Sequence, residues 1–139
     1  MSLVLDASLT LAWYFEDEAT AATDAVLGQV VQAGAIVPAL WRLEVANGFQ
    51  TAIRRKRIDI AYRDASLCEL NLLPISIDRS GDVFTWTGTL RLSDRFGISV
   101  YDAAYLELAQ RRELPLATLD RALGRAAARV KVEVMGGPN

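Results

Sequence analysis

The sequence predicts an α/β fold with a mainly parallel sheet. Short apolar runs recur along the chain, and most are followed by a longer segment whose apolar residues repeat at helical spacing. The length of 139 residues favours one domain, and 52% hydrophobic residues can form a core without disulfides or a structural metal. Helices between strands favour parallel strand pairing, because such crossovers join parallel neighbours.

About five short strands are expected. The first apolar run stops at Asp6, the second lies between Gly34 and Pro38, and the third begins with Pro74. Glycine and proline are typical at such boundaries. The expected strands are residues 2–5, 35–37, 74–77, 115–118 and 130–134.

Helical segments fill the stretches between these strands. Asp59 is a predicted N-cap, and Gly34 is a predicted helix end. Gly81 and Gly88 weaken the helical pattern around them. The expected helices are residues 8–14, 18–33, 40–57, 59–72, 80–96, 99–112 and 119–129. Residues 1–135 are expected to form one domain, and residues 136–139 a frayed tail.

Composition excludes several classes of protein. Fifteen basic against 17 acidic residues exclude a broadly basic nucleic-acid-binding surface, though not a local basic patch. The absence of histidine excludes catalytic triads and histidine bases. A single cysteine, Cys68, permits no intrachain disulfide and is expected in the core of a protein in a reducing compartment. No apolar stretch approaches the ~20 residues of a membrane helix, and Asp6 interrupts a signal-like start, so we expect a cytoplasmic location.

Four acidic residues are candidates for chemistry. Asp6 and Asp120 follow expected strands, which is where open α/β sheets bind ligands. Asp102 lies in the first turn of an expected helix, and Glu44 lies on an otherwise apolar helix. Simpler roles remain open: both strand-end residues are good helix caps, Asp102 suits a helix N-terminus, and Arg42 or Arg54 is an available partner for Glu44.

The four acids together indicate a cation site more strongly than any of them does singly. In a parallel sheet they can converge at one edge, where close carboxylates raise one another's pKa values. A divalent cation removes that conflict, and ligands that are all oxygen suit Mg²⁺ or Mn²⁺. Such ions activate water for phosphodiester cleavage. The pattern therefore favours a metal-dependent hydrolase.

Basic and aromatic residues give weaker indications. The dense basic run consists of Arg54, Arg55, Lys56 and Arg57. Either it contacts RNA phosphates, or it is a solvated helix end whose cations suit the helix dipole. Arg121 and Arg125 are weaker candidates for RNA contacts. The aromatic residues Trp41 and Trp86 are assigned to packing.

The chain resembles the PIN-domain ribonucleases, specifically the VapC-type toxins of toxin–antitoxin pairs. The resemblance lies in four segments, and their order and spacing make it specific. They are Leu3-Val4-Leu5-Asp6-Ala7-Ser8, then Pro38 to Asn47 around Glu44, then Tyr101-Asp102-Ala103-Ala104, and Leu116-Ala117-Thr118-Leu119-Asp120. No motif is recognised in the third strand or between Gly81 and Gly88.

The resemblance implies a three-layer α/β/α PIN-like fold and a Mg²⁺- or Mn²⁺-dependent endoribonuclease that cleaves RNA. Asp6, Glu44, Asp102 and Asp120 match the acidic quartet of the family, which is catalytic and binds the metal. Ser8 and Thr118 match hydroxyl positions that support the site. The resemblance also implies a homodimer and a VapB-type antitoxin as partner. The alternative is a PIN-like binding or scaffold module without catalysis.

Overall fold

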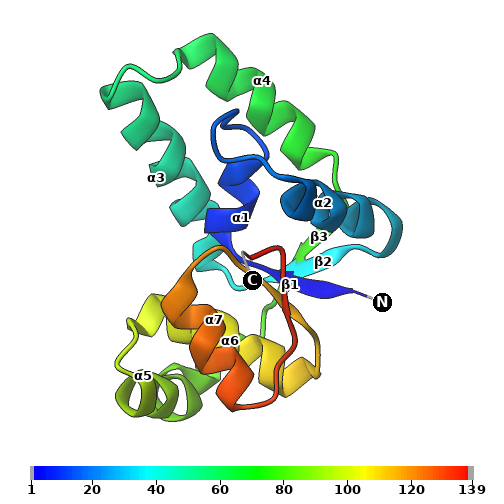
Figure 1. Ribbon diagram of the computed structural model, residues 1–139. Coiled ribbons are helices and arrows are strands. Elements are labelled where there is room, and N and C mark those ends of the chain that lie inside the picture. The colour runs from blue at the N-terminus through cyan, green and yellow to red at the C-terminus, as the bar shows by residue number, and fades with distance from the viewer. Residues whose placement is uncertain (1, 138–139) are drawn as a thin grey trace.

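A computed structural model describes residues 2–137 of the chain as a three-layer α/β/α structure (Figure 1). Its five strands are all parallel, in the order β3-β2-β1-β4-β5, which confirms the predicted fold class. Helices α1 to α4 lie on one side of the sheet, and α5 to α7 lie on the other. The strands are β1 (Leu3–Leu5), β2 (Ala35–Val37), β3 (Ile75–Ile77), β4 (Leu116–Ala117) and β5 (Val134–Met135).

The central strand, β1, is entirely buried, as its unbroken apolar run predicts for a strand covered on both faces. It pairs with β2 on one side and β4 on the other, and Leu5 lies opposite Ala117. The strand order reverses at this pair, because β2 and β3 extend from one side of β1 while β4 and β5 extend from the other. The register places Asp6 beside Thr118 at the carboxyl ends, where such folds bind ligands.

Side-chain caps define most helix starts. The carboxylate of Asp59 accepts a hydrogen bond from the Tyr62 amide at 2.8 Å, which confirms Asp59 as an N-cap. Thr20 and Ser99 cap two other helices. The α-helices are α1 (Ala7–Ala12), α2 (Ala21–Ala33), α3 (Leu40–Arg54), α4 (Ile60–Asn71), α5 (Leu90–Phe96), α6 (Val100–Arg112) and α7 (Arg121–Arg129).

Two predicted elements differ from the structure. The single helix expected over residues 80–96 is a 3₁₀ turn, η1 (Gly81–Phe84), a π-helical segment, η2 (Thr85–Thr89), and then α5. Gly81 permits the first departure, because a Cβ there would stand 2.8 Å from a carboxylate oxygen of Asp78. The strand expected over residues 130–134 begins only at Val134, since Lys131 turns the backbone with a φ of 63°.

Two side chains assigned to the core lie at the surface. Cys68 is exposed, because its apolar neighbours Leu67 and Leu70 take the inward positions of α4. Trp86 is 86% exposed on η2, whereas Trp41 is buried as predicted and donates its indole N–H to Thr10.

The end of the expected domain and its tail are only partly described. Gly136 follows β5 and lies against Leu9 and Val26, while residues 138–139 lie outside the described part of the chain. Within residues 2–137, no helix combines the length and the apolar character needed to cross a bilayer.

Candidate active site

Asp6 is the most buried member of the predicted acidic quartet, with 5% of its surface exposed. It caps α1 through Oδ1, which accepts a hydrogen bond from the Ser8 amide at 3.2 Å. Oδ2 accepts from the Ser8 hydroxyl at 2.9 Å and from the Thr118 hydroxyl. Burial raises the pKa of Asp6, these hydrogen bonds oppose the rise, and the carboxylate of Asp120 adds to it.

Ser8 and Thr118 join the ends of β1 and β4. The Thr118 hydroxyl donates to Asp6 and accepts the Asp120 amide at 3.0 Å, while the Ser8 hydroxyl accepts the Leu119 amide at 3.2 Å. Asp120 caps α7, because its Oδ1 accepts from the Leu123 amide at 3.0 Å. Asp6 and Asp120 therefore do cap helices, as the simpler interpretation expects. The same hydrogen bonds hold both carboxylates at one edge of the sheet.

Glu44 reaches the same region from α3, where it is half-buried. The Tyr105 hydroxyl donates to its Oε1 at 2.6 Å. Burial raises the pKa of Glu44, Tyr105 lowers it, and the carboxylates of Asp6 and Asp102 raise it further. The anticipated alternative, an arginine partner, is not found: Arg54 donates to Thr51, and the ion pairs between residues 2 and 137 do not involve Glu44.

Asp102 lies in the first turn of α6, and its backbone amide donates to the capping hydroxyl of Ser99 at 3.0 Å. Burial raises its pKa, and the carboxylates of Asp120 and Asp6 add to the rise. The structure therefore brings the four predicted acids close enough to act on one another electrostatically. Across residues 2–137, none of the four has a basic side chain as an ion-pair partner.

The donor chemistry of this cluster fits a hard divalent cation. Its carboxylate and hydroxyl oxygens are the ligands that Mg²⁺ and Mn²⁺ prefer. Burial, and then neighbouring carboxylates, raise the pKa values of three members, and a bound cation would favour their charged forms. The cluster is not a finished coordination shell, because no three acidic, cysteine or histidine side chains of residues 2–137 are arranged to hold a metal. Mg²⁺ needs only one or two protein carboxylates, since it usually keeps several waters.

Comparison with known protein families identifies the family of this chain. The PIN domain family matches residues 3–129, which include all four acids. The chain belongs to the PIN domain family. PIN domains are generally nucleases, so membership supports nuclease activity. No curated protein sequence gives a significant match.

Solved structures share the PIN fold of this chain at low sequence identity. PAE2754 from Pyrobaculum aerophilum has a TM-score of 0.65 and 24% identity, over 91% of this chain and 87% of its own. FitAcB from Neisseria gonorrhoeae has a TM-score of 0.63 and 16% identity, over 96% of each chain. A toxin-antitoxin complex from Klebsiella pneumoniae has a TM-score of 0.59 and 16% identity, over 99% and 96%. At these identities the likeness shows the fold alone.

The predicted basic run lies away from the acids of this PIN domain. Glu44 is near the start of α3 and Arg54 is its last residue, which corresponds to about 15 Å along a helix. Figure 1 shows α3 running outward from the sheet to the turn before α4. Arg57 is already engaged there: it pairs with Asp17 at 2.8 Å and lies 4.7 Å from the ring centre of Phe15.

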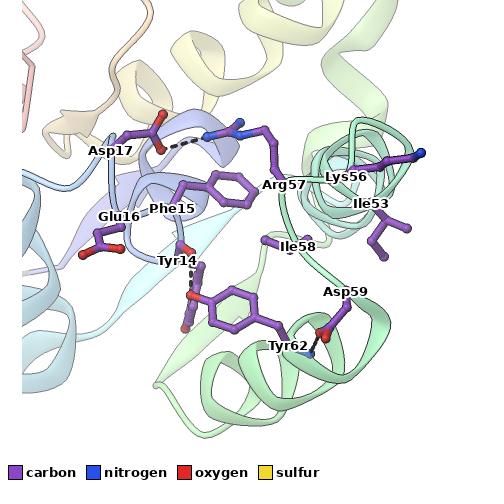
Figure 2. A pocket seen from close by; sticks show the side chains of 10 residues that line it. All are labelled: Tyr14, Phe15, Glu16, Asp17, Ile53, Lys56, Arg57, Ile58, Asp59 and Tyr62. Atoms are coloured by element: carbon purple, nitrogen blue, oxygen red, sulfur yellow. Dashed lines mark hydrogen bonds and ion pairs between the residues drawn. The ribbon is translucent and has the colours of Figure 1, made fainter.

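The residues around Arg57 line an open hollow of about 940 Å³ between the loop after α1 and the turn before α4 (Figure 2). Its walls carry both signs of charge: Asp17 faces and pairs with Arg57, while Lys56 and Asp59 lie on either side of Arg57 along the same segment. The Tyr62 hydroxyl closes one side by donating to the Tyr14 carbonyl at 2.5 Å. This hollow contains none of the four acids.

A second hollow, of about 450 Å³, begins at the acidic cluster itself. Thr118 and Asp120 form one end, and the exposed side chains of Arg121 and Arg125 lie along α7 beside it. These arginines are therefore nearer to the acids than the basic run is.

Sequence reasoning missed two polar groups. Tyr105 contacts Glu44 although 61 positions separate them; the available signal was its place three residues after Asp102, on the same face of α6. The other group is Asp78 with Glu107 and Arg111. Arg111 donates to Asp78 at 2.5 Å and to Glu107 at 2.9 Å. The i,i+4 spacing of Glu107 and Arg111 was a signal for the second contact, whereas the contact with Asp78 had none.

Proposed function

We propose that this PIN domain is a metal-dependent endoribonuclease and the toxin of a type II toxin–antitoxin pair. The observation that carries the proposal is the cluster of Asp6, Glu44, Asp102 and Asp120, whose charges no basic side chain of residues 2–137 neutralises. Three of these carboxyls have raised pKa values, so assembling the cluster costs stability. A protein that serves only as a scaffold has no use for unpaired carboxylates that lower its stability, whereas a cation site is built from such carboxylates.

In the proposed enzyme, Asp6, Asp102 and Asp120 would be the main ligands of Mg²⁺ or Mn²⁺, and Glu44 would complete the set directly or through water; waters kept by the ion would fill the rest of its shell. Bound there, the ion would activate water and stabilise the leaving oxygen of a phosphodiester. Ser8 and Thr118 hold the Asp6 carboxylate in one orientation through their hydrogen bonds. The caps on α1 and α7 keep Asp6 and Asp120 fixed to rigid elements.

RNA phosphates need positive charge near an acidic centre that repels them. Arg121 and Arg125 supply it most directly, because they line the hollow that begins at Thr118 and Asp120. Arg54, Arg55 and Lys56 form a more distant contact region, and the ion pairs of Arg57 leave it less available. Phosphate contacts of this kind make affinity depend on salt.

The partners follow from the proposed class. The likeness in fold to the toxin-antitoxin complex from Klebsiella pneumoniae supports an antitoxin as partner. A VapB-type antitoxin, a homodimer and a cytoplasmic location belong to the same proposal, because the RNA substrate and the antitoxin must meet the protein there.

Cleavage of a single-stranded RNA in Mg²⁺, in EDTA, and by Asp6→Asn tests the proposal. We expect cleavage only by the wild-type chain with metal. Asp94→Asn, a change at an exposed acid on α5, is the control and should cleave normally. Cleavage that resists EDTA would contradict the metal role. A chain that neither cleaves RNA nor binds Mn²⁺ in calorimetry would be a scaffold instead.

A further inference from the structure

Tyr105 lies fully buried among residues that carry the acidic cluster. It is on α6, three residues after Asp102, and none of its surface is exposed. Its ring belongs to the hydrophobic core, but its hydroxyl points to Glu44 on α3. A buried tyrosine hydroxyl needs a hydrogen-bond partner. Here that partner is a member of the acidic cluster, which suggests that Tyr105 does more than fill the core.

The direction of this hydrogen bond follows from the chemistry of its two groups. The Tyr105 hydroxyl has one proton to donate and an ionised Glu44 carboxylate can only accept, so Tyr105 is the donor. The donor–acceptor distance of 2.6 Å to Oε1 is that of a charge-assisted hydrogen bond.

This contact restricts what Glu44 offers to a ligand. Glu44 is only half-buried, and without a partner its carboxylate would sample several rotamers. With Oε1 bound to Tyr105, Oε2 is the oxygen left for a further ligand. Tyr105 also links two elements that each carry an acid, namely α3 and α6.

We propose that Tyr105 is a positioning residue that holds Glu44 by one oxygen and leaves the other free for a cation bound at the acidic cluster, directly or through water. This inference rests on the proposed function. Tyr105 itself touches neither the cation nor RNA in this arrangement, and it acts through Glu44. Partners of this kind, one step behind a ligand, typically contribute 10–100-fold to metal affinity or activity.

The test compares Mn²⁺ affinity, measured by electron paramagnetic resonance, between the wild-type chain and Tyr105→Phe. Phenylalanine keeps the buried ring and removes only the hydroxyl, so we expect affinity to fall about tenfold. Tyr101→Phe is the matched control, because Tyr101 is on the same helix but 65% exposed. Leu70→Ala controls for lost stability, since it opens the core at α4, a helix that carries none of the four acids. Both controls should keep wild-type affinity.

A second measurement requires no change at Tyr105. With tyrosines labelled at Cζ, Mg²⁺ should shift the resonance of Tyr105 and leave that of Tyr62, in the distant hollow, in place. The shift should shrink in Glu44→Gln, which reports that the effect passes through Glu44.

The outcomes separate the two proposals. Wild-type Mn²⁺ binding that is equally tight in Tyr105→Phe, or a Tyr105 resonance that ignores Mg²⁺, would overturn the inference and leave the nuclease proposal standing. A wild-type chain without any Mn²⁺ site would overturn both. Affinity lost equally in Leu70→Ala would show a structural effect and also overturn the inference.

Discussion

Two groups of carboxylates follow strands of the same sheet, and they differ in how their charge is balanced. Asp78 comes directly after β3 and, together with Glu107, is bound by Arg111. Asp6 comes directly after β1 and, together with Glu44, Asp102 and Asp120, faces other carboxylates. The difference teaches that burial of acids does not by itself indicate a cation site.

The pKa of each group records the same contrast. Asp78 is buried, which raises its pKa, but hydrogen bonds from Arg111 and Ser80 outweigh burial, and the net pKa is lowered. In the acidic cluster burial and neighbouring carboxylates act together, so the net pKa of Asp6, Glu44 and Asp102 is raised. The first group stabilises the fold at neutral pH, and the second destabilises it.

The largest expected effect is at Arg111. Arg111→Met leaves Asp78 and Glu107 buried without their cation, so the free energy of unfolding should fall by about 3–5 kcal/mol in urea denaturation. Arg112→Met changes the next, exposed residue and should cost less than about 0.5 kcal/mol. A small loss at Arg111 would show that the two carboxylates are balanced in some other way, and the contrast between the groups would disappear.

Asp102→Asn should act in the opposite direction on stability. We expect RNA cleavage to fall about a hundredfold, as for loss of one electrostatic contact to a transition state. We also expect the free energy of unfolding to rise slightly, because the substitution removes a charge that burial and neighbouring carboxylates disfavour. Asp94→Asn is the matched exposed control. Loss of stability in Asp102→Asn would mean that the carboxylate has a favourable partner.

Acidification should also separate the two groups. The folded pKa values of Asp6, Glu44 and Asp102 lie above those of the unfolded chain, about 4. Their unfavourable contribution is present at neutral pH and disappears as pH falls through the raised values toward 4, so stability should rise over that window. Asp78 has a lowered pKa, so its favourable contribution is lost only below about pH 4. Urea midpoints between pH 7 and 4.5 measure this, and the rise should be smaller in Asp102→Asn.

The smallest expected effect concerns RNA binding in a catalytically inactive background, for example Asp6→Asn. Replacing Arg121 and Arg125 with Ala should reduce the slope of log affinity against log salt by up to about 1.4, or 0.7 for each lost phosphate contact on a single strand. Replacing Arg54 and Arg55 should reduce it less. A larger reduction from the second pair would place the RNA along α3 instead of α7.

Most of the fold could be predicted from the sequence, because each strand is indicated by a short run of neighbouring residues. Runs such as Ala35–Val37, enclosed by Gly34 and Pro38, need no tertiary information. The irregular path of residues 80–96 cannot be predicted, because two glycines interrupt the helical period without indicating which turn replaces it. The apolar neighbours of Cys68 predict a core position, but on a helix with 3.6 residues per turn a residue next to buried ones in sequence can still point to solvent.

The acidic quartet could be predicted because each member lies at a recognisable place, such as a strand end or a helix start. Its partners could not, because the contacts of Tyr105 with Glu44 and of Arg111 with Asp78 join residues 61 and 33 positions apart. Such contacts depend on the side-chain geometry of the folded chain. That geometry is also what distinguishes the balanced acids from the unbalanced ones.

The middle strand of the sheet, β1, is the first one to leave the ribosome, yet its neighbour β4 is among the last. The Asp6 carboxylate accepts a hydrogen bond from the Thr118 hydroxyl, which is synthesised 112 positions later. During translation a growing chain therefore carries an incomplete set of acids until Asp120 has been made. The order of synthesis itself delays the appearance of the proposed nuclease inside the cell that produces it.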